Sequence, residues 1–128
     1  MKVYFAGSIR GGRQDAELYR KVIAALKEKH QVLTEHVGDL SLSTVEDKGD
    51  QAIYEQDTAW LRECNVVVAE CTQVSLGVGY ELAYAEAHGK KKYIFSTAQR
   101  KRSYLLCWPE MNDSTYIAIR MNLRYWRR

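Results

Sequence analysis

The chain has 128 residues, of which 46% are hydrophobic and 27% are charged, and its formal net charge is +3. This length suits one domain, and the composition excludes the low hydrophobicity and high net charge that are typical of disordered chains. Every apolar run is far shorter than the roughly 20 residues of a membrane-spanning helix, and the first residues lack the apolar segment of a signal peptide, so we expect a cytoplasmic protein with no membrane partner.

Strand and helix patterns alternate along most of the sequence. From apolar runs and from apolar residues at helical spacing we predict strands at residues 3–6, 31–33, 66–71 and 92–95 and helices at 15–29, 51–63 and 77–88. Residues 38–50 are predicted as a loop, 103–108 as a short helix and 115–120 as a fifth strand. The β-branched run at 66–68 is typical of a strand that is buried on both faces.

This alternation predicts an α/β fold with a single domain over residues 1–128. We expect five parallel strands in the flavodoxin-like, or Rossmann-like, doubly wound order 2-1-3-4-5. In that order the loops after the first and third strands flank the crevice where such sheets bind ligands. Because those two loops carry most of the glycines, we expect the functional site there.

The loop after the first strand has the sequence Gly7-Ser8-Ile9-Arg10-Gly11-Gly12-Arg13 and precedes a helix. Glycines let backbone N–H groups approach an anion, the helix N-terminus adds positive potential, and arginine binds two phosphate oxygens at once. The loop therefore fits a phosphate cradle, although it matches neither the Walker A pattern nor Gly-x-Gly-x-x-Gly. An ordinary strand-to-helix turn with exposed arginines explains the same spacing equally well.

Two carboxylates are candidates for catalysis. Glu81 follows the second glycine-containing loop, where the helix dipole alone would favour an acidic residue. Asp57 shares a helical face with Ile53 and Leu61, so burial would raise the pKa of its carboxyl toward that of a general acid, whereas a hydrogen bond to an amide or an arginine would make it structural. Paired carboxylates are typical of glycosidic chemistry, and a nearby phosphate cradle would make a nucleotide the substrate.

Four motifs together resemble the 2′-deoxynucleoside 5′-phosphate N-hydrolases of the nucleoside 2-deoxyribosyltransferase superfamily. They are YFAGSIRGGR at 4–13, LTEHV at 33–37, EQDTAWL at 55–61 and SLGVGYEL at 75–82. The resemblance covers most of the chain up to residue 103 and weakens beyond it, where the tail at 125–128 departs from the family pattern. It implies a flavodoxin-like fold, a homodimer, and no metal or other cofactor.

The resemblance also implies a role for each matching residue. Glu81 would be the nucleophile that forms a covalent deoxyribosyl 5-phosphate intermediate, which water then opens, and Asp57 would assist as an acid or orienting group. Tyr4 would lie near the sugar C2′, where relatives that act on ribonucleotides carry Phe, so tyrosine favours deoxyribose. His36 is a further candidate near the base. The residues implied for the substrate and its 5′-phosphate are Gly7, Ser8, Ile9, Arg10, Gly11, Ser75, Gly79 and Ser103, the last contributed across the dimer interface.

We therefore expect hydrolysis of the N-glycosidic bond of 2′-deoxynucleoside 5′-monophosphates to a free nucleobase and 2-deoxyribose 5-phosphate. A first alternative is a nucleoside 2-deoxyribosyltransferase that exchanges bases, against which the phosphate-type loop argues. A second is a non-catalytic nucleotide-binding protein or a nucleic-acid-binding module. The pattern that suggests this second alternative is Tyr125 and Trp126 among arginines, since stacking aromatics beside arginines can bind single strands. Because this pattern is short, we expect no nucleic acid partner. No residue pattern indicates the preferred base.

Overall fold

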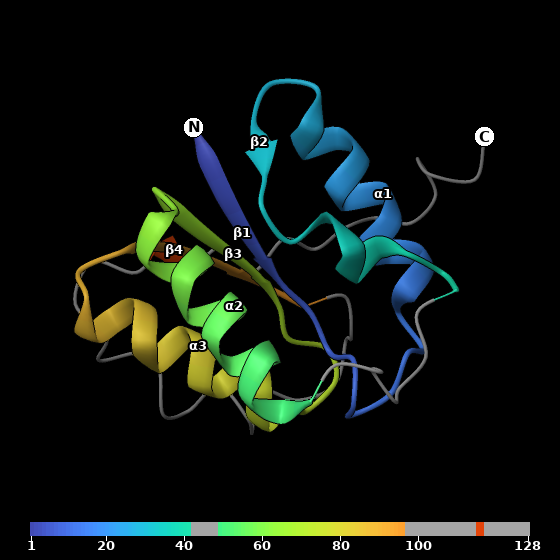
Figure 1. Ribbon diagram of the computed structural model, residues 1–128. Coiled ribbons are helices and arrows are strands. Elements are labelled where there is room, and N and C mark those ends of the chain that lie inside the picture. Colours follow the sequence, from blue (N-terminus) through green and yellow to red (C-terminus); the bar gives the residue numbers. More distant parts are fainter. Residues whose placement is uncertain (42–48, 97–114, 117–128) are drawn as a thin grey trace.

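The computed structural model describes residues 1–41, 49–96 and 115–116. Its main strands are β1 (Lys2–Ala6), β2 (Gln31–Val32), β3 (Val66–Glu70) and β4 (Lys91–Phe95), and its helices are α1 (Ala16–Lys27), the 3₁₀ helix η1 (Glu35–Gly38), α2 (Asp50–Glu63) and α3 (Leu76–Ala87) (Figure 1). Each predicted strand and helix up to residue 95 is present, within two residues of its expected bounds. The short η1 was not predicted, because four residues are too few to show a period. Within the described ranges no helix is long and apolar enough to cross a membrane.

The strands form one sheet in the order β2-β1-β3-β4, and every neighbouring pair is parallel. The predicted order of the first four strands is therefore confirmed. Of the predicted fifth strand, only β5 (Thr115–Tyr116) is described, and its backbone pairs with Tyr93 and Ile94 of β4. Residues 117–120 and the short helix predicted at 103–108 lie outside the described residues, so these two elements stay predictions.

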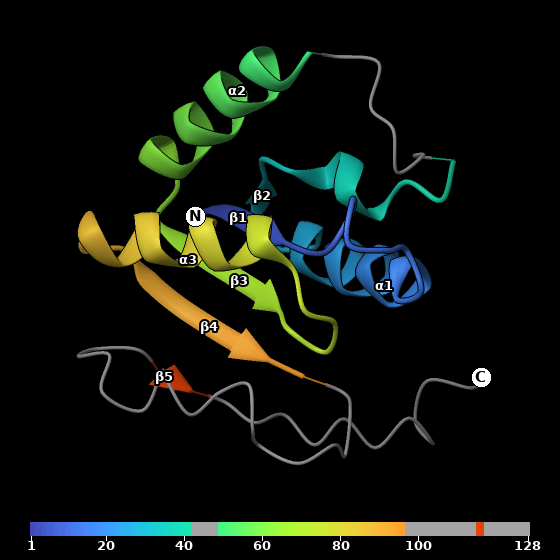
Figure 2. The same ribbon diagram turned by 90° about the horizontal axis from the view of Figure 1, so that it is seen from below.

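Side chains of the central strands alternate between two hydrophobic cores, one on each face of the sheet. Val3 and Phe5 of β1 pack on the face that α1 covers, whereas Tyr4 and Ala6 pack on the face that α2 and α3 cover (Figures 1 and 2). Strand β3 is buried on both faces, as its β-branched run predicts. Since parallel strands end at the same edge, the β1–α1 and β3–α3 loops meet there.

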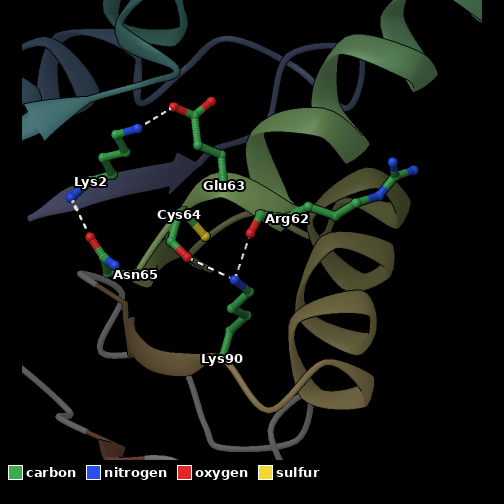
Figure 3. A network of polar contacts seen from close by, with 6 residues as sticks. All are labelled: Lys2, Arg62, Glu63, Cys64, Asn65 and Lys90. Atoms are coloured by element: carbon green, nitrogen blue, oxygen red, sulfur yellow. Dashed lines mark hydrogen bonds and ion pairs between the residues drawn. The ribbon is translucent and has the colours of Figure 1, made fainter.

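At the opposite edge of the sheet, a polar network ties the end of α2 to β1 and to the start of β4 (Figure 3). The Lys90 ammonium donates hydrogen bonds to the carbonyl oxygens of Arg62, at 2.7 Å, and Cys64, at 2.9 Å. The side-chain oxygen of Asn65 accepts the backbone N–H of Lys2 at 2.8 Å. We call these contacts the amino-edge brace. The brace fixes the C-terminal end of α2 and thereby the direction in which α2 runs toward the loops at the other edge.

Candidate active site

A cleft of about 560 Å³ opens at the edge of the sheet where β1 and β3 end. This volume lies within the range of roughly 300–1,000 Å³ that is common for small-molecule sites. The β1–α1 loop, the segment after β2, one face of α2 and the first turn of α3 form its walls. The cleft therefore occupies the crevice that the strand order predicts.

Most of the predicted site residues meet in this cleft although they come from separate segments. Those that line it are Tyr4, Gly7, Ile9, Arg10, Gly11, His36, Asp57, Ser75 and Glu81. Two predicted residues do not line it: Ser8 is only 1% exposed, and Gly79 of α3 is exposed to solvent outside the cleft. Ser103, which we predicted to act across a dimer interface, lies outside the described residues.

Tyr4 and Glu81 form the polar centre of the cleft. The Tyr4 hydroxyl donates a hydrogen bond to Glu81 Oε1 at 2.8 Å. The other oxygen, Glu81 Oε2, is buried and has no hydrogen-bond partner among the described residues. The pKa of Glu81 is raised to about 8, mainly by burial. The hydrogen bond from Tyr4 lowers this pKa, and the negative charge of Asp57 raises it further. Glu81 thus has one oxygen that Tyr4 holds in place and a second that makes no hydrogen bond among the described residues.

The position of Tyr4 follows from the alternation of side chains along β1. Its ring packs in the core under α2 and α3, and its hydroxyl end reaches the cleft. Burial, and then the charges of Glu81 and Asp57, raise the pKa of the phenol well above its usual value. Tyr4 therefore stays protonated at neutral pH and remains a hydrogen-bond donor to the carboxylate.

Asp57 reaches the cleft because the apolar stripe of α2 runs from the core to the site. Leu61 at one end of the stripe is fully buried, whereas Ile53 and Asp57 line the cleft. The half-buried Asp57 carboxylate raises the pKa of both Tyr4 and Glu81, so its charge acts directly on the polar centre. The two candidate carboxylates therefore belong to one site, as predicted, and the acid role of Asp57 stays a prediction.

The N-terminus of α3 forms the wall beside the β1–α1 loop. Ser75 caps this helix by accepting the N–H of Val78 on its hydroxyl oxygen at 3.3 Å. Leu76 and Gly77, in the first turn of the helix, line the cleft, and their N–H groups lie at the positive end of the helix dipole. This wall can bind an anion.

The β1–α1 loop closes against the β3–α3 loop because Gly11 has no side chain. A Cβ atom at Gly11 would lie 2.7 Å from Ser8 Oγ and 3.1 Å from the carbonyl oxygen of Val74. The Arg10 guanidinium extends from the same loop and pairs with Asp50 at the start of α2, at 2.7 Å, with both side chains largely exposed. A cation therefore stands at the cleft entrance beside the anion-binding wall.

The 3₁₀ helix η1 brings His36 into the cleft. The ring of His36 lies 5.6 Å from that of Trp60 on α2, measured between centroids, so an aromatic pair joins these two walls. Arg13 donates to the carbonyl oxygens of Val37, at 2.9 Å, and Asp39, at 2.7 Å. Arg13, which we expected in the phosphate cradle, does not line the cleft and braces η1 instead.

Two further residues hold the cleft walls and were not predicted. The Gln73 amide donates to the carbonyl oxygen of Gly11 and so ties the two loops together. The Thr34 hydroxyl accepts the N–H of Phe5 at 2.8 Å and donates to its carbonyl oxygen at 2.7 Å, which extends the contact of β1 with the segment after β2. Each is a polar residue shortly after a predicted strand, a position that many loops share, and Thr34 also belongs to the motif at 33–37.

Hydrophobic side chains surround the mouth of the cleft. Tyr54, Val74 and Leu76 line it and are exposed, and Leu76 is 93% exposed. The ring of Tyr54 lies 6.3 Å from that of Tyr80, which is also exposed.

Among the described residues, no group of three or more His, Cys, Asp or Glu side chains is arranged to hold a metal ion.

Comparison with known proteins gives concordant results. A family model described as nucleoside 2-deoxyribosyltransferase matches residues 3–115. A 5-hydroxymethyl-dUMP N-hydrolase from Mus musculus is 56% identical over 91 residues, which cover 69% of this chain and 53% of the mouse protein. The protein of the same name from Homo sapiens is 50% identical over 92 residues, which cover 70% and 53% of the two chains. The matched part of the chain thus spans about half the length of these relatives.

Two solved structures have a similar fold. A CMP N-glycosidase from Clostridium botulinum has a TM-score of 0.65 and 22% identity, with 92% of this chain and 88% of that chain covered. A 2-desoxiribosyltransferase from Leishmania mexicana has a TM-score of 0.56 and 25% identity, with 77% and 66% covered. The parallel sheet and its strand order β2-β1-β3-β4 are therefore those of deoxyribosyltransferase-like proteins.

Proposed function

The chain belongs to the nucleoside 2-deoxyribosyltransferase family, and from this membership we propose that it hydrolyses the N-glycosidic bond of 2′-deoxynucleoside 5′-monophosphates. The products are a free nucleobase and 2-deoxyribose 5-phosphate. The observation that carries the proposal is the Glu81 carboxyl in the cleft, with one oxygen bound by Tyr4 and the other buried without a partner in the described structure. The names of the mouse and human relatives make 5-hydroxymethyl-dUMP the first substrate to test.

In the first step, the Glu81 carboxylate attacks C1′ of the deoxyribose. The C1′–N bond breaks, and its electron pair leaves with the base, which takes up a proton from an acid. Asp57 serves as this acid or orients the base, since it lines the cleft and its charge acts on Glu81. The oxocarbenium-like transition state is stabilised by the negative charge that Glu81 brings to C1′.

In the second step, water attacks C1′ of the covalent glycosyl intermediate. The bond between C1′ and the Glu81 oxygen breaks, the carboxylate reforms, and a base takes the proton of the water. The Tyr4 hydroxyl donates to Glu81 Oε1 and holds the carboxylate in both steps. We propose that this hydroxyl also lies beside the sugar C2′, where it favours deoxyribose over ribose.

The 5′-phosphate is proposed to lie between the β1–α1 loop and the N-terminus of α3. Gly7, Ile9 and Gly11 line this side of the cleft together with Ser75, and Arg10 stands at its entrance. The ion pair of Arg10 with Asp50 is exposed, so exchanging it for a phosphate costs little. This anion-binding wall favours a nucleotide over a free nucleoside and therefore hydrolysis over base exchange.

We propose further that the chain acts as a homodimer, with the partner subunit's Ser103 reaching the phosphate. The support is the exposed hydrophobic rim of the cleft, formed by Tyr54, Val74 and Leu76. An isolated monomer leaves this rim in water, whereas a second copy would cover it and exclude water from C1′.

Base release from a panel of nucleotides tests the proposal. The panel contains 5-hydroxymethyl-dUMP, the common deoxynucleoside monophosphates, their ribonucleotide counterparts and the free deoxynucleosides. We expect release from deoxynucleotides alone, loss of release in Glu81→Ala, and normal release in Glu55→Ala, a control on the exposed side of α2. Preference for nucleosides with an acceptor base would indicate an exchange enzyme, and a folded protein that releases no base would contradict catalysis.

A further inference from the structure

Glu70, the last residue of β3, is a buried carboxylate that the proposed reaction does not use. Its side chain is 1% exposed and, by the alternation along β3, lies on the α1 face of the sheet, behind the cleft. One oxygen, Oε1, accepts the N–H of Thr72 at 2.9 Å and also the Thr72 hydroxyl. The other oxygen, Oε2, is buried and makes no hydrogen bond in the described part of the chain.

Tyr19 of α1 faces this carboxylate. Its hydroxyl oxygen accepts the backbone N–H of Ser8 in the β1–α1 loop at 3.1 Å. Burial and then the charge of Glu70 raise the pKa of Tyr19, so the phenol keeps its proton. Conversely, the Tyr19 hydroxyl lowers the pKa of Glu70, which burial raises. The two side chains therefore act on each other.

From these contacts, and on the basis of the proposed function, we infer that Glu70 and Tyr19 are positioning residues that hold the phosphate-binding loops in place. The Tyr19 hydroxyl accepts the N–H of Ser8, and the buried Glu70 carboxyl is near enough for each side chain to shift the pKa of the other. The same carboxylate fixes Thr72 at the start of the β3–α3 loop. One buried carboxyl group and the tyrosine beside it thus contact both loops that face the proposed 5′-phosphate site.

The packing around Gly7 supports this role. A Cβ atom at Gly7 would lie 3.0 Å from the Tyr19 ring, so the loop lies directly on that ring. The Phe5 ring lies 5.6 Å from the Tyr19 ring, between centroids, and supports it from β1. Neither Tyr19 nor Glu70 lines the cleft, so both act through the loop backbone rather than on the substrate.

Binding of 2-deoxyribose 5-phosphate, followed by NMR titration, tests the inference without turnover and without a choice of base. We expect Tyr19→Phe and Glu70→Gln each to weaken binding about tenfold, because the loop N–H groups lose their fixed direction. The matched control is Tyr84→Phe, which removes a hydroxyl that accepts Arg62 Nε at 2.9 Å on the surface of α3. This control should bind like the parent protein.

Steady-state kinetics supply the second measurement. For the deoxynucleotide with the fastest base release, we expect KM to rise about tenfold in both variants and kcat to change less than about twofold, a split that a general loss of folded protein does not give. If Tyr19→Phe does not fold, Glu70→Gln, which keeps an acceptor for Thr72, gives the same test.

The outcomes separate this inference from the proposed function. Normal binding and normal KM in folded Tyr19→Phe and Glu70→Gln would overturn the positioning role and leave the hydrolase intact. A parent protein that does not bind 2-deoxyribose 5-phosphate at all would overturn the phosphate site of the proposed function, and the positioning role with it.

Discussion

The sheet carries two buried tyrosine–glutamate pairs, one on each face, and only one of them opens into the cleft. In the first pair, the hydroxyl of Tyr4 donates to Glu81, whose second oxygen is buried but uncommitted among the described residues. In the second pair, the hydroxyl of Tyr19 accepts the backbone N–H of Ser8, and Glu70 accepts the backbone N–H of Thr72. The residue types are the same, and the partners differ.

A raised pKa alone does not identify a catalytic carboxyl. Burial raises the pKa of both Glu81 and Glu70. Glu81 lines the cleft and faces a second carboxylate there, whereas Glu70 is enclosed and holds loop backbone. Access to a ligand and the identity of the hydrogen-bond partners, rather than burial, are therefore the grounds on which we propose chemistry at the first pair and support of the loops at the second.

The largest expected effect separates the two glutamates by activity. Glu81→Gln should lower kcat/KM for base release by at least about 10³-fold, because an amide neither attacks C1′ nor carries the negative charge. Glu70→Gln should lower kcat/KM only about tenfold. Similar losses in the two variants, with both proteins folded, would remove the distinction between a reactive and a supporting pair.

The two tyrosines give the next contrast. Tyr4→Phe removes the hydrogen bond that lowers the pKa of Glu81, so that pKa should rise above its parent value of about 8. In the parent protein, kcat/KM should rise with pH up to about 8, since the nucleophile must be ionised. Tyr4→Phe should move this rise to higher pH and lower kcat/KM at pH 7 about 10- to 100-fold.

The pH profile of Tyr19→Phe should keep the parent midpoint, because Tyr19 does not touch Glu81. A midpoint that stays in place in Tyr4→Phe would show that the titrating group is not Glu81.

Tyr4→Phe should also gain activity on ribonucleotides, and the absence of any gain would contradict the role of this hydroxyl in sugar selection.

The stability of the first pair should depend on pH in a definite direction. The pKa of Glu81 is raised from 4.5 to about 8 in the folded protein, so the folded state holds the extra proton. Its contribution to stability is present below about pH 4.5 and is lost as the pH rises to about 8. Glu81→Gln should therefore become more stable than the parent protein as the pH rises, by on the order of 1–3 kcal/mol at pH 9.

Denaturant unfolding at pH 5 and pH 9 measures this difference. If Glu81→Gln is instead less stable than the parent protein at pH 9, the ionised Glu81 carboxylate stabilises the fold. That result would contradict the prediction that ionisation of Glu81 destabilises the folded protein.

The fold and the place of the cleft could be predicted because local patterns encode them. The β-branched run of β3 and the apolar stripe of α2 identify their elements by themselves, and the switch point follows from the order of strands and helices. The two carboxylates of the cleft were candidates from their positions, but a structural role explained each position equally well, and their catalytic roles were predicted from the resemblance to a known family.

The second pair could not be predicted, because it depends on contacts between distant segments. In the sequence alone, Glu70 is a polar residue near the end of a buried strand, and Tyr19 is one more residue among those at helical spacing in the predicted helix at 15–29. The same limit explains Ser8, whose N–H is bound by Tyr19 and whose side chain is buried, although a glycine-containing loop predicts exposed donors. Arg13 likewise binds the carbonyls around η1, an element too short for its period to show.

The smallest expected effect comes from the amino-edge brace and tests whether lost stability alone can imitate lost positioning. Lys90→Met removes two hydrogen bonds to carbonyls at the end of α2 and should lower the free energy of unfolding by about 1–2 kcal/mol. None of the residues of the brace lines the cleft, so binding of 2-deoxyribose 5-phosphate should stay within about twofold of the parent protein. Lys29→Met, at an exposed lysine, is the control and should change neither quantity. If Lys90→Met weakened binding as much as Tyr19→Phe does, the weaker binding of Tyr19→Phe would be explained by lost stability. Only the first pair, Tyr4 and Glu81, would then keep a proposed role in function.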